Sequence, residues 1–236
     1  MLPIVLVPGL LCTAEVFAPQ VAALWPYGPV TVASTLQGQT IAEMAAAILT
    51  VAPPCFALAG ISMGGYISFE IMRQAPERVL KLALLSTHAR PDTPEQSTQR
   101  RALIAQARAL DVDESEGFAA LLAPTLRALL HPAHQDDPAL REGNVRMGRT
   151  VGVKALGRQL EAVIGRVDSR PSLPAISVPT LVLVGDGDPL ISLDRAEEMA
   201  TAIPGARFVV VPECGHLSTL EQPEAVNRAL IEWITE

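Results

Sequence analysis

The sequence has few cysteines, few aromatic residues and few charged residues for its length. Its 236 residues include three cysteines, an odd number without paired spacing. This usage argues against a disulfide framework and indicates a reducing compartment. Aromatic residues make up 4% and charged residues 18%, whereas hydrophobic residues make up 49%. Such a composition argues against disorder and is sufficient for one α/β domain with a substantial core.

Long hydrophobic runs and basic runs are also missing. No apolar stretch reaches the roughly 18–20 residues that span a bilayer. The formal net charge of −7 argues against nucleic acid as the main partner. The segment Met1–Val7 is apolar but short and lacks a basic start, which favours a first strand over a signal peptide. We therefore expect a cytoplasmic protein with neither a membrane nor a nucleic-acid partner.

The most informative segment is Gly60–Gly64, which fits the pattern G-x-S-x-G. Residues 54–59 before it are mostly apolar and predict a buried strand, and residues 65–74 after it predict a helix that Pro76 ends. A serine on a tight turn between a strand and a helix is typical of a hydrolase nucleophile. Glycines at such a bend tolerate the strained backbone that exposes the hydroxyl. Ser62 is therefore the candidate nucleophile.

A serine nucleophile needs a base, and the base needs a group that holds its tautomer. His216 follows an apolar run and a glycine, which predicts a loop at the end of a strand. The β-branched strand 180–184 is followed at once by Gly185-Asp186-Gly187-Asp188. In one class of hydrolases the acid lies between the serine and the histidine in the sequence. Both aspartates lie there, so their position does not decide which of them supplies the carboxylate.

With these motifs the chain resembles the α/β-hydrolase superfamily over nearly its whole length. In that family the acid commonly lies three residues after the glycine that ends its strand, which favours Asp188 over Asp186. The Gly215-His216 pair matches the family's histidine, which precedes the last helix. The resemblance thus implies a triad of Ser62, Asp188 and His216.

The resemblance also implies an oxyanion hole made of two backbone N–H groups. One belongs to the residue after the nucleophile, which is Met63 here. The other follows the first strand, where this chain has Val7-Pro8-Gly9-Leu10 and Pro8 stands in place of the family's frequent histidine. Because the donor is a backbone group, we assign it to Leu10.

The rest of the sequence alternates between strand and helix patterns. Strands are expected at residues 4–7, 30–34, 54–59, 79–85, 180–184 and 207–211, and helices at 13–24, 40–49, 65–74 and 224–234. Alternating units with nearly continuous apolar strands predict a mostly parallel sheet of about six strands with helices on both faces. The candidate residues all fall at the carboxyl ends of these strands, where such sheets bind ligands.

Residues 88–170 interrupt this alternation. Helices are expected at 101–110, 117–130 and 138–164, rich in alanine and leucine and poor in aromatic residues. The segment occupies the position of the family's cap, so we divide the chain into a hydrolase core, 1–87 and 171–236, and a helical cap insertion, 88–170. A cap of this composition implies an apolar pocket that excludes water.

Several other residues have ordinary structural interpretations. His88 follows the fourth expected strand and could line the site, but a solvated loop is favoured. The pair His131 and His134 is expected in a surface loop, because no third ligand accompanies it. Asp92 is a minor alternative for the triad acid, and Cys12 and Cys214 are expected to pack beside the site. The arginines of the cap are expected on a wet helical face, from which one could reach a substrate carboxylate: Arg141, Arg146, Arg149 and Arg158.

These observations favour a serine hydrolase of small carboxylic esters or related acyl substrates that uses no cofactor and no metal. Its partner is expected to be a small apolar ester or acyl substrate. A fold does not determine which reaction its active site catalyses, so two alternatives stay open. One is a cofactor-free oxygenase, lyase or C–C hydrolase on the same scaffold. The other is a hydrolase-fold sensor that binds a ligand without catalysis.

Overall fold

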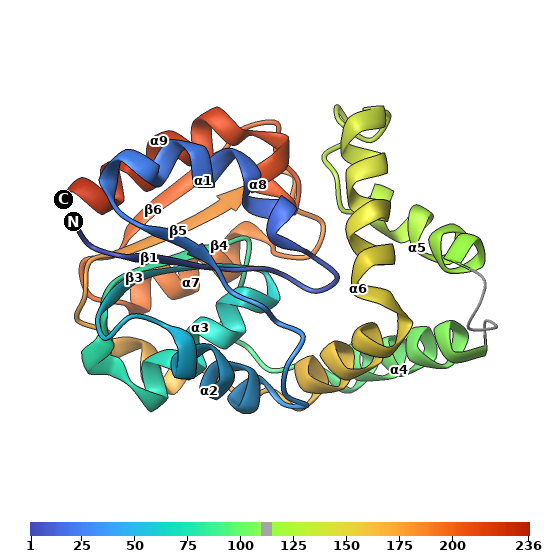
Figure 1. Cartoon of the computed structure of the whole chain (residues 1–236), viewed down its shortest axis with the longest axis horizontal. Coiled ribbons are helices and arrows are strands. Elements are labelled where there is room, and N and C mark those ends of the chain that lie inside the picture. Colours follow the sequence, from blue (N-terminus) through green and yellow to red (C-terminus); the bar gives the residue numbers. More distant parts are fainter. Residues whose placement is uncertain (110–114) are drawn as a thin grey trace.

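The computed structural model describes residues 1–109 and 115–236 (Figure 1). Within these residues, six parallel strands form one sheet in the order β2-β1-β3-β4-β5-β6. The strands are β1 (Ile4–Val7), β2 (Val30–Val32), β3 (Phe56–Ile61), β4 (Val79–Leu85), β5 (Thr180–Gly185) and β6 (Arg207–Val211). The prediction of a parallel sheet of about six strands is confirmed.

Helices cover both faces of the sheet, as predicted. Helices α1 (Ala18–Leu24) and α9 (Pro223–Thr235) pack on one face, and α2 (Ile41–Val51), α3 (Met63–Gln74) and α7 (Leu193–Ala202) pack on the other (Figure 1). Successive side chains of a strand point to opposite faces of the sheet, so each strand contributes to both apolar layers. In β1, Val5 and Val7 join the cluster beneath α2 and α3, whereas Ile4 and Leu6 join the cluster beneath α1 and α9. Strands buried on both sides explain the continuous apolar runs.

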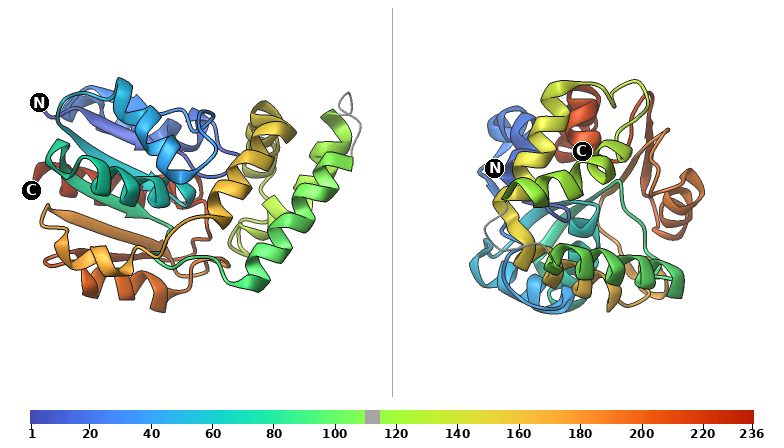
Figure 2. Two further views of the ribbon diagram at one scale, coloured as in Figure 1. Left: turned by 90° about the horizontal axis from the view of Figure 1, so that it is seen from below. Right: turned by 90° about the vertical axis from the view of Figure 1, so that its right-hand side faces the viewer.

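Three helices between β4 and β5 stand at the carboxyl ends of the strands, away from both chain termini (Figures 1 and 2). They are α4 (Pro94–Ala109), α5 (Ser115–Ala128) and α6 (Pro138–Ile164). Their buried side chains form a separate apolar cluster, which Leu11 from the loop after β1 also joins. Helix α6 bends at Gly152, whose φ of 80° and ψ of 166° are not helical. We refer to α4–α6 as the cap; the domain limits at residues 88 and 170 stay a prediction.

Several helices depart from the sequence expectation, among them α4, α7 and the short α8 (Ser218–Glu221), which was not predicted. Helix α7 was not predicted, although Ala196 and Met199 along it and Ile203 directly after it are buried. Helix α4 begins at Pro94 rather than Arg101, and its expected end at Leu110 lies outside the described residues. The start is fixed by a reciprocal cap in which Gln96 N donates to Thr93 Oγ1 at 3.2 Å and Thr93 N donates to Gln96 Oε1 at 3.0 Å.

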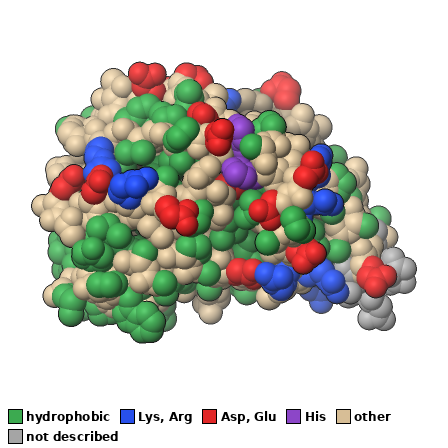
Figure 3. Space-filling view, turned by 90° about the horizontal axis from the view of Figure 1, so that it is seen from above, with side chains coloured by type: hydrophobic (Ala, Val, Ile, Leu, Met, Phe, Trp, Pro, Cys, Tyr) green, Lys and Arg blue, Asp and Glu red, His purple; other side chains and the backbone are tan. Residues whose placement is uncertain are grey.

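The surface carries both signs of charge. On the face in Figure 3, acidic and basic side chains are interspersed and do not gather by sign. Among the described residues, no helix is both long and apolar enough to cross a bilayer.

The start of α3 lies very close to the backbone of β1. A Cβ added at Gly64 would come 2.0 Å from the carbonyl oxygen of Val7, and one added at Gly60 would come 2.3 Å from the carbonyl oxygen of Gly64. Both distances are far below van der Waals contact, and the atoms approached are backbone atoms that cannot rotate away. Only glycine fits at these two positions.

A Gly64→Ala variant is expected to lose about 3 kcal/mol or more of unfolding free energy, because the methyl group must displace β1 or α3. Urea denaturation followed by circular dichroism measures this loss. Gly165→Ala is the matched control, since its Cβ would lie 3.5 Å from Glu161 O at a φ of −81°. Equal stability of the two variants would contradict the close packing of α3 on β1.

Candidate active site

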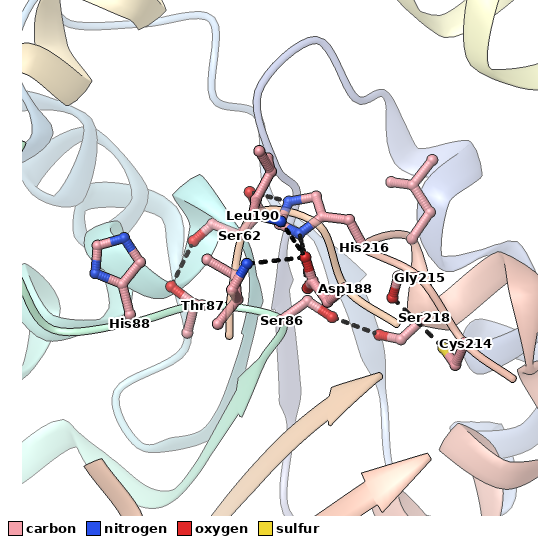
Figure 4. A network of polar contacts seen from close by, with 12 residues as sticks. Ser62, Ser86, Thr87, His88, Asp188, Leu190, Cys214, Gly215, His216 and Ser218 are labelled. Carbon is pink, nitrogen blue, oxygen red and sulfur yellow. Dashed lines mark hydrogen bonds and ion pairs between the residues drawn. The ribbon is translucent and has the colours of Figure 1, made fainter. Parts of the chain in front are cut away.

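Ser62 lies on a one-residue bend between β3 and α3. Its φ of 55° and ψ of −117° belong to a strained region that side chains rarely adopt. Neighbouring groups hold the bend: Ser62 N donates to Leu85 O at 3.0 Å, and Thr87 Oγ1 donates to Ser62 O at 2.9 Å (Figure 4). The bend lifts the hydroxyl from the sheet edge into the space beneath the cap.

The three predicted triad side chains meet at this edge. Ser62 Oγ lies 2.8 Å from Nε2 of His216, and Nδ1 of His216 lies 2.9 Å and 3.0 Å from the two carboxylate oxygens of Asp188 (Figure 4). Both partners of the serine are buried. With Nδ1 beside a carboxylate, the ring proton lies on Nδ1 and Nε2 can accept the serine proton. The geometry is that of a nucleophile, a base and an orienting acid.

The two candidate aspartates have different neighbours. Asp188 Oδ1 accepts hydrogen bonds from Leu190 N and Ile191 N, both at 2.9 Å, and the carboxylate faces His216. Asp186 Oδ1 instead accepts from Cys214 N at 3.1 Å and so fixes the turn before the histidine. Only Asp188 is therefore placed to act on His216.

Two backbone donors assigned to the oxyanion hole both line the cavity at Ser62. Met63 is the first residue of α3, so its amide N–H has no acceptor within the helix. Within the described residues, the amide N–H of Leu10 donates no hydrogen bond either. The next amide is occupied, because Leu11 N donates to Gln159 Oε1 at 3.0 Å. This pattern leaves the Leu10 and Met63 donors available to a ligand.

Sequence reasoning missed Gln159, a buried residue of α6. Besides accepting from Leu11 N, its Nε2 donates to Thr35 Oγ1 at 3.1 Å. The side chain thus ties the loop after β1 to the cap and to the loop after β2. A glutamine on an amphipathic helix looks like a surface residue in sequence, so no pattern could have revealed this contact.

Sequence reasoning also gave no role to Glu221, which is buried in α8 (Ser218–Glu221). Its carboxylate accepts three backbone N–H groups: His131 N at 2.7 Å, Leu217 N at 3.0 Å and Gly215 N at 3.1 Å. In addition, His216 N donates to Leu129 O at 2.8 Å. Residues that follow α5 of the cap are therefore bonded to the loop that carries His216.

The cavity above Ser62 has a volume of about 300 Å³. Its roof carries apolar side chains from all three cap helices, among them Leu103, Leu122, Leu126, Met147, Leu160 and Val163, together with polar side chains such as Thr125 and Asn144. The expected apolar, roofed pocket is thus present. A volume near the lower end of the range for ligand pockets, roughly 300–1,000 Å³, suits a small molecule.

The expectation for His88 was wrong. His88 is not in a solvated loop but is buried and lines the cavity at Ser62, where Tyr66 Oη lies 3.2 Å from its Nε2. Strand β4 ends at Leu85, but the chain stays buried through Ala89, so a histidine that the sequence places in a loop is buried. Burial, together with the nearby charge of Arg166, lowers the pKa of His88 to about 3.

The remaining candidates do not join the triad. Asp92 forms ion pairs with Arg100 and Arg166, and no side chain of the triad contacts it among the described residues. His131 and His134 lie between α5 and α6, and the described residues contain no group of three or more ligands that could hold a metal. Most of the cap arginines are exposed, as expected: Arg141, Arg146 and Arg149 are exposed and Arg158 is half-buried.

The cysteines beside the site are poor nucleophiles. Cys12 lines the cavity, and burial raises the pKa of its thiol to about 12. Cys214 is buried in the sheet core, and burial raises the pKa of its thiol as well. Both stay as neutral thiols, in keeping with a packing role.

Comparisons with known proteins agree with the fold. Residues 42–223 match the family model described as alpha/beta hydrolase fold. The pimeloyl-(acyl-carrier protein) methyl ester esterase of Aromatoleum aromaticum is 27% identical over 80% of this chain and 77% of its own. Among solved structures, a thermophilic esterase from Thermogutta terrifontis is 31% identical with a TM-score of 0.87, covering 100% of this chain and 90% of that one. The enol-lactonase of Burkholderia xenovorans is 26% identical with a TM-score of 0.85, covering 99% and 91%.

The two aspartates can be separated by substitution. Asp188→Asn should slow the reaction of Ser62 with a fluorophosphonate probe by roughly 10²–10⁴, because an amide no longer fixes the reactive tautomer of His216. Asp186→Asn, the matched control, should slow it far less. Rates of probe labelling measure both, and the reverse ranking would transfer the acid to Asp186.

Glu221→Gln should reduce the labelling rate of Ser62 roughly 10–100-fold and lower the melting temperature. The amide places an NH₂ group against buried N–H donors, so one donor loses its acceptor and the loop of His216 shifts. Glu224→Gln, an exposed change in α9, serves as the control. Normal labelling by Glu221→Gln would show that the loop holds His216 without this carboxylate.

Proposed function

The chain belongs to the alpha/beta hydrolase family, and from this premise we propose that it is a serine hydrolase of small carboxylic esters or related acyl substrates. The observation that carries the proposal is the hydrogen-bonded series Ser62–His216–Asp188 at the floor of a roofed cavity. The similarity to two proteins named as esterases supports the same reaction class.

In the proposed reaction, Ser62 Oγ attacks the carbonyl carbon of the ester while His216 Nε2 takes its proton. Asp188 stabilises the imidazolium that forms, which has Nδ1–H directed at the carboxylate. The tetrahedral intermediate collapses, His216 protonates the departing alkoxide, and an acyl-enzyme remains. Water then enters, loses a proton to His216 and releases the carboxylic acid. No step needs a cofactor or a metal.

The negative charge of the tetrahedral intermediate lies on the former carbonyl oxygen. We assign its stabilisation to the amide N–H groups of Leu10 and Met63, which line the cavity beside Ser62. Donors that are in place before the reaction need no reorganisation when the charge develops. Each typically lowers the activation barrier by roughly 3–4 kcal/mol. Gln159 supports this by holding the amide next to Leu10.

The cavity also suggests the size of the substrate. Its roof is mostly aliphatic and its volume is about 300 Å³, so an acyl chain gains binding free energy only while it fits beneath the cap. Each buried CH₂ contributes roughly 0.8 kcal/mol. Short and medium acyl chains therefore match the site better than either acetyl or long fatty acyl groups.

A series of p-nitrophenyl esters from C2 to C16 tests this proposal. kcat/KM should rise from acetyl to short or medium chains and then fall, and Ser62→Ala should lose both hydrolysis, by roughly 10³–10⁶, and fluorophosphonate labelling. Folding of the variant is checked by circular dichroism. Retention of more than about a tenth of the activity in Ser62→Ala would refute the nucleophile. Labelling of Ser62 without hydrolysis of any ester would favour a sensor or another reaction on the scaffold.

A further inference from the structure

One corner of the cavity at Ser62 is polar, in contrast to its mostly aliphatic roof. Tyr66 and His88 line it from the core, and Gln96, Gln99 and Arg100 line it from α4. Figure 4 shows His88 on the opposite side of Ser62 from His216. The proposed chemistry uses none of these side chains, so their grouping at one part of a mostly apolar cavity, which Thr125 and Asn144 also line, suggests a ligand that they could recognise.

The hydrogen bonds around His88 determine where the proton of Tyr66 points. Arg90 N donates to His88 Nδ1 at 3.1 Å, so Nδ1 is the acceptor nitrogen of the ring. His88 stays neutral, because burial lowers its pKa to about 3, and its single ring proton is therefore on Nε2. That N–H donates to Tyr66 Oη at 3.2 Å. The phenol thus accepts from His88 and must direct its own hydrogen elsewhere.

The phenol of Tyr66 is consequently a donor without an intramolecular acceptor. Burial raises the pKa of Tyr66, so the hydroxyl keeps its hydrogen. Across the described part of the chain, the contact with His88 is the only hydrogen bond of this hydroxyl. Since Tyr66 lines the cavity, the free O–H is directed toward space that a ligand can occupy.

The same corner carries an excess of positive charge. Asp92 is shared by two guanidinium groups: its Oδ2 accepts from Arg100 Nε at 2.7 Å, and its Oδ1 accepts from Arg166 Nη1. The exposed fraction is 1% for the side chain of Asp92 and 3% for that of Arg166. One carboxylate between two guanidinium groups leaves a net charge of +1, and neutral His88 does not change it. Arg195 on α7 adds further positive potential at Tyr66 and His88.

Arg166 and Arg100 differ in how many of their N–H groups are bonded within the protein. Arg166 is buried and held by the protein through Nε, which donates to Arg90 O, and through Nη1, which also donates to Val163 O. Its guanidinium lies 4.3 Å from the centre of the Tyr66 ring, and among the described residues its buried Nη2 has no partner. Arg100 uses only Nε for Asp92, and within residues 1–109 and 115–236 its two Nη atoms have no partner. The side chain of Arg100 is 29% exposed and lines the cavity. Arg100 can therefore bind an anion while Arg166 holds Asp92 in place.

We propose that Tyr66 and Arg100 bind an ionised carboxylate of the substrate, so that the preferred substrates are esters with a second, free carboxyl group. This inference rests on the proposed esterase function. A hydroxyl donor beside a guanidinium suits a carboxylate, which accepts from both and neutralises the buried excess charge. A neutral ester leaves Arg100 without that partner. The class includes half-esters of dicarboxylic acids, with the carboxylate on the acyl side, and esters of hydroxy acids, with the carboxylate on the alcohol side.

Paired substrates test the proposal. kcat/KM is measured for monoethyl esters of C4–C8 dicarboxylic acids and for ethyl esters of monocarboxylic acids with the same number of heavy atoms. A second pair compares butyryl esters of glycolic acid and of ethanol, which places the carboxylate on the alcohol side. In at least one arm the acidic ester should be favoured roughly 10–100-fold, as expected for charge-assisted hydrogen bonds. Equal or lower values for the acidic ester in both arms would overturn the proposal.

Variants assign the preference to its residues. Arg100→Gln and Tyr66→Phe should each reduce the ratio of acidic to neutral kcat/KM at least roughly fivefold, mainly through KM. Arg101→Gln is the matched control, because the neighbouring Arg101 is exposed and does not line the cavity; its ratio should equal that of the unaltered protein. A ratio that Arg100→Gln and Tyr66→Phe leave intact would place the recognition of the carboxylate elsewhere.

Binding to the Ser62→Ala variant separates this proposal from the esterase function. Isothermal titration should show tighter binding of monoethyl adipate than of ethyl hexanoate, and the added Arg100→Gln change should remove the difference. If no ester is hydrolysed but this binding difference is present, the esterase function fails and the carboxylate site stands. If esters are hydrolysed but the two ligands bind alike, the carboxylate site fails and the esterase function stands.

Discussion

The arrangement of this site depends on the contact between the first turn of α3 and the backbones of β1 and β3. Gly64 lies against the carbonyl of Val7, and Gly60 lies against that of Gly64, at distances that leave no room for a Cβ. Because the backbones meet there, the chain reverses within one residue and Ser62 takes a φ of 55°. The hydroxyl then lies at the carboxyl ends of the strands, where the loops after β1, β5 and β6 begin. Loss of this contact would displace the nucleophile and its surrounding donors together.

The cap covers the cavity and also holds two loops of the site in place. Gln159 of α6 fixes the amide beside the assigned oxyanion donor Leu10, and Leu129 and His131 bond to the loop of His216, the latter through Glu221. Two loops that carry proposed catalytic groups thus take part of their geometry from an element inserted between β4 and β5. Changes in cap sequence can therefore alter the rate of the reaction as well as the choice of substrate.

The sequence allowed most of the sheet and the meeting of Ser62, Asp188 and His216 to be predicted, because these features follow from local patterns. Apolar runs marked the strands, and each candidate residue directly followed one of them. The choice of Asp188 over Asp186 depended on the resemblance to a family, since spacing alone left both open. Helix α7 and the start of α4 were missed although amphipathic spacing and the Thr93–Gln96 cap could have revealed them.

Other features of the site had no local signal. Gln159, Glu221 and the burial of His88 arise from contacts between segments far apart in sequence, such as Glu221 with His131 and Leu11 with Gln159. A polar residue in a helix or loop has the same appearance in sequence whether it faces water or a buried amide. The polar corner of the cavity was therefore beyond prediction, because it forms only when α4 is folded back over the residues that follow β4.

The bond between Glu221 and the backbone of His131 joins residues separated by 90 positions, and this has a consequence for the order of folding. Contacts of such separation close long loops, and they form late because the entropy lost in closing a loop precedes the gain from its contacts. The strand pairs β1–β2 and β3–β4 close shorter stretches of chain. These strand pairs can thus form while the loop of His216 still lacks its anchor, whereas the pairing of β4 with β5, which sets Leu82 opposite Thr180, closes a stretch of chain at least as long as that contact does. A newly made chain would therefore form part of its sheet before Ser62, His216 and Asp188 are held together.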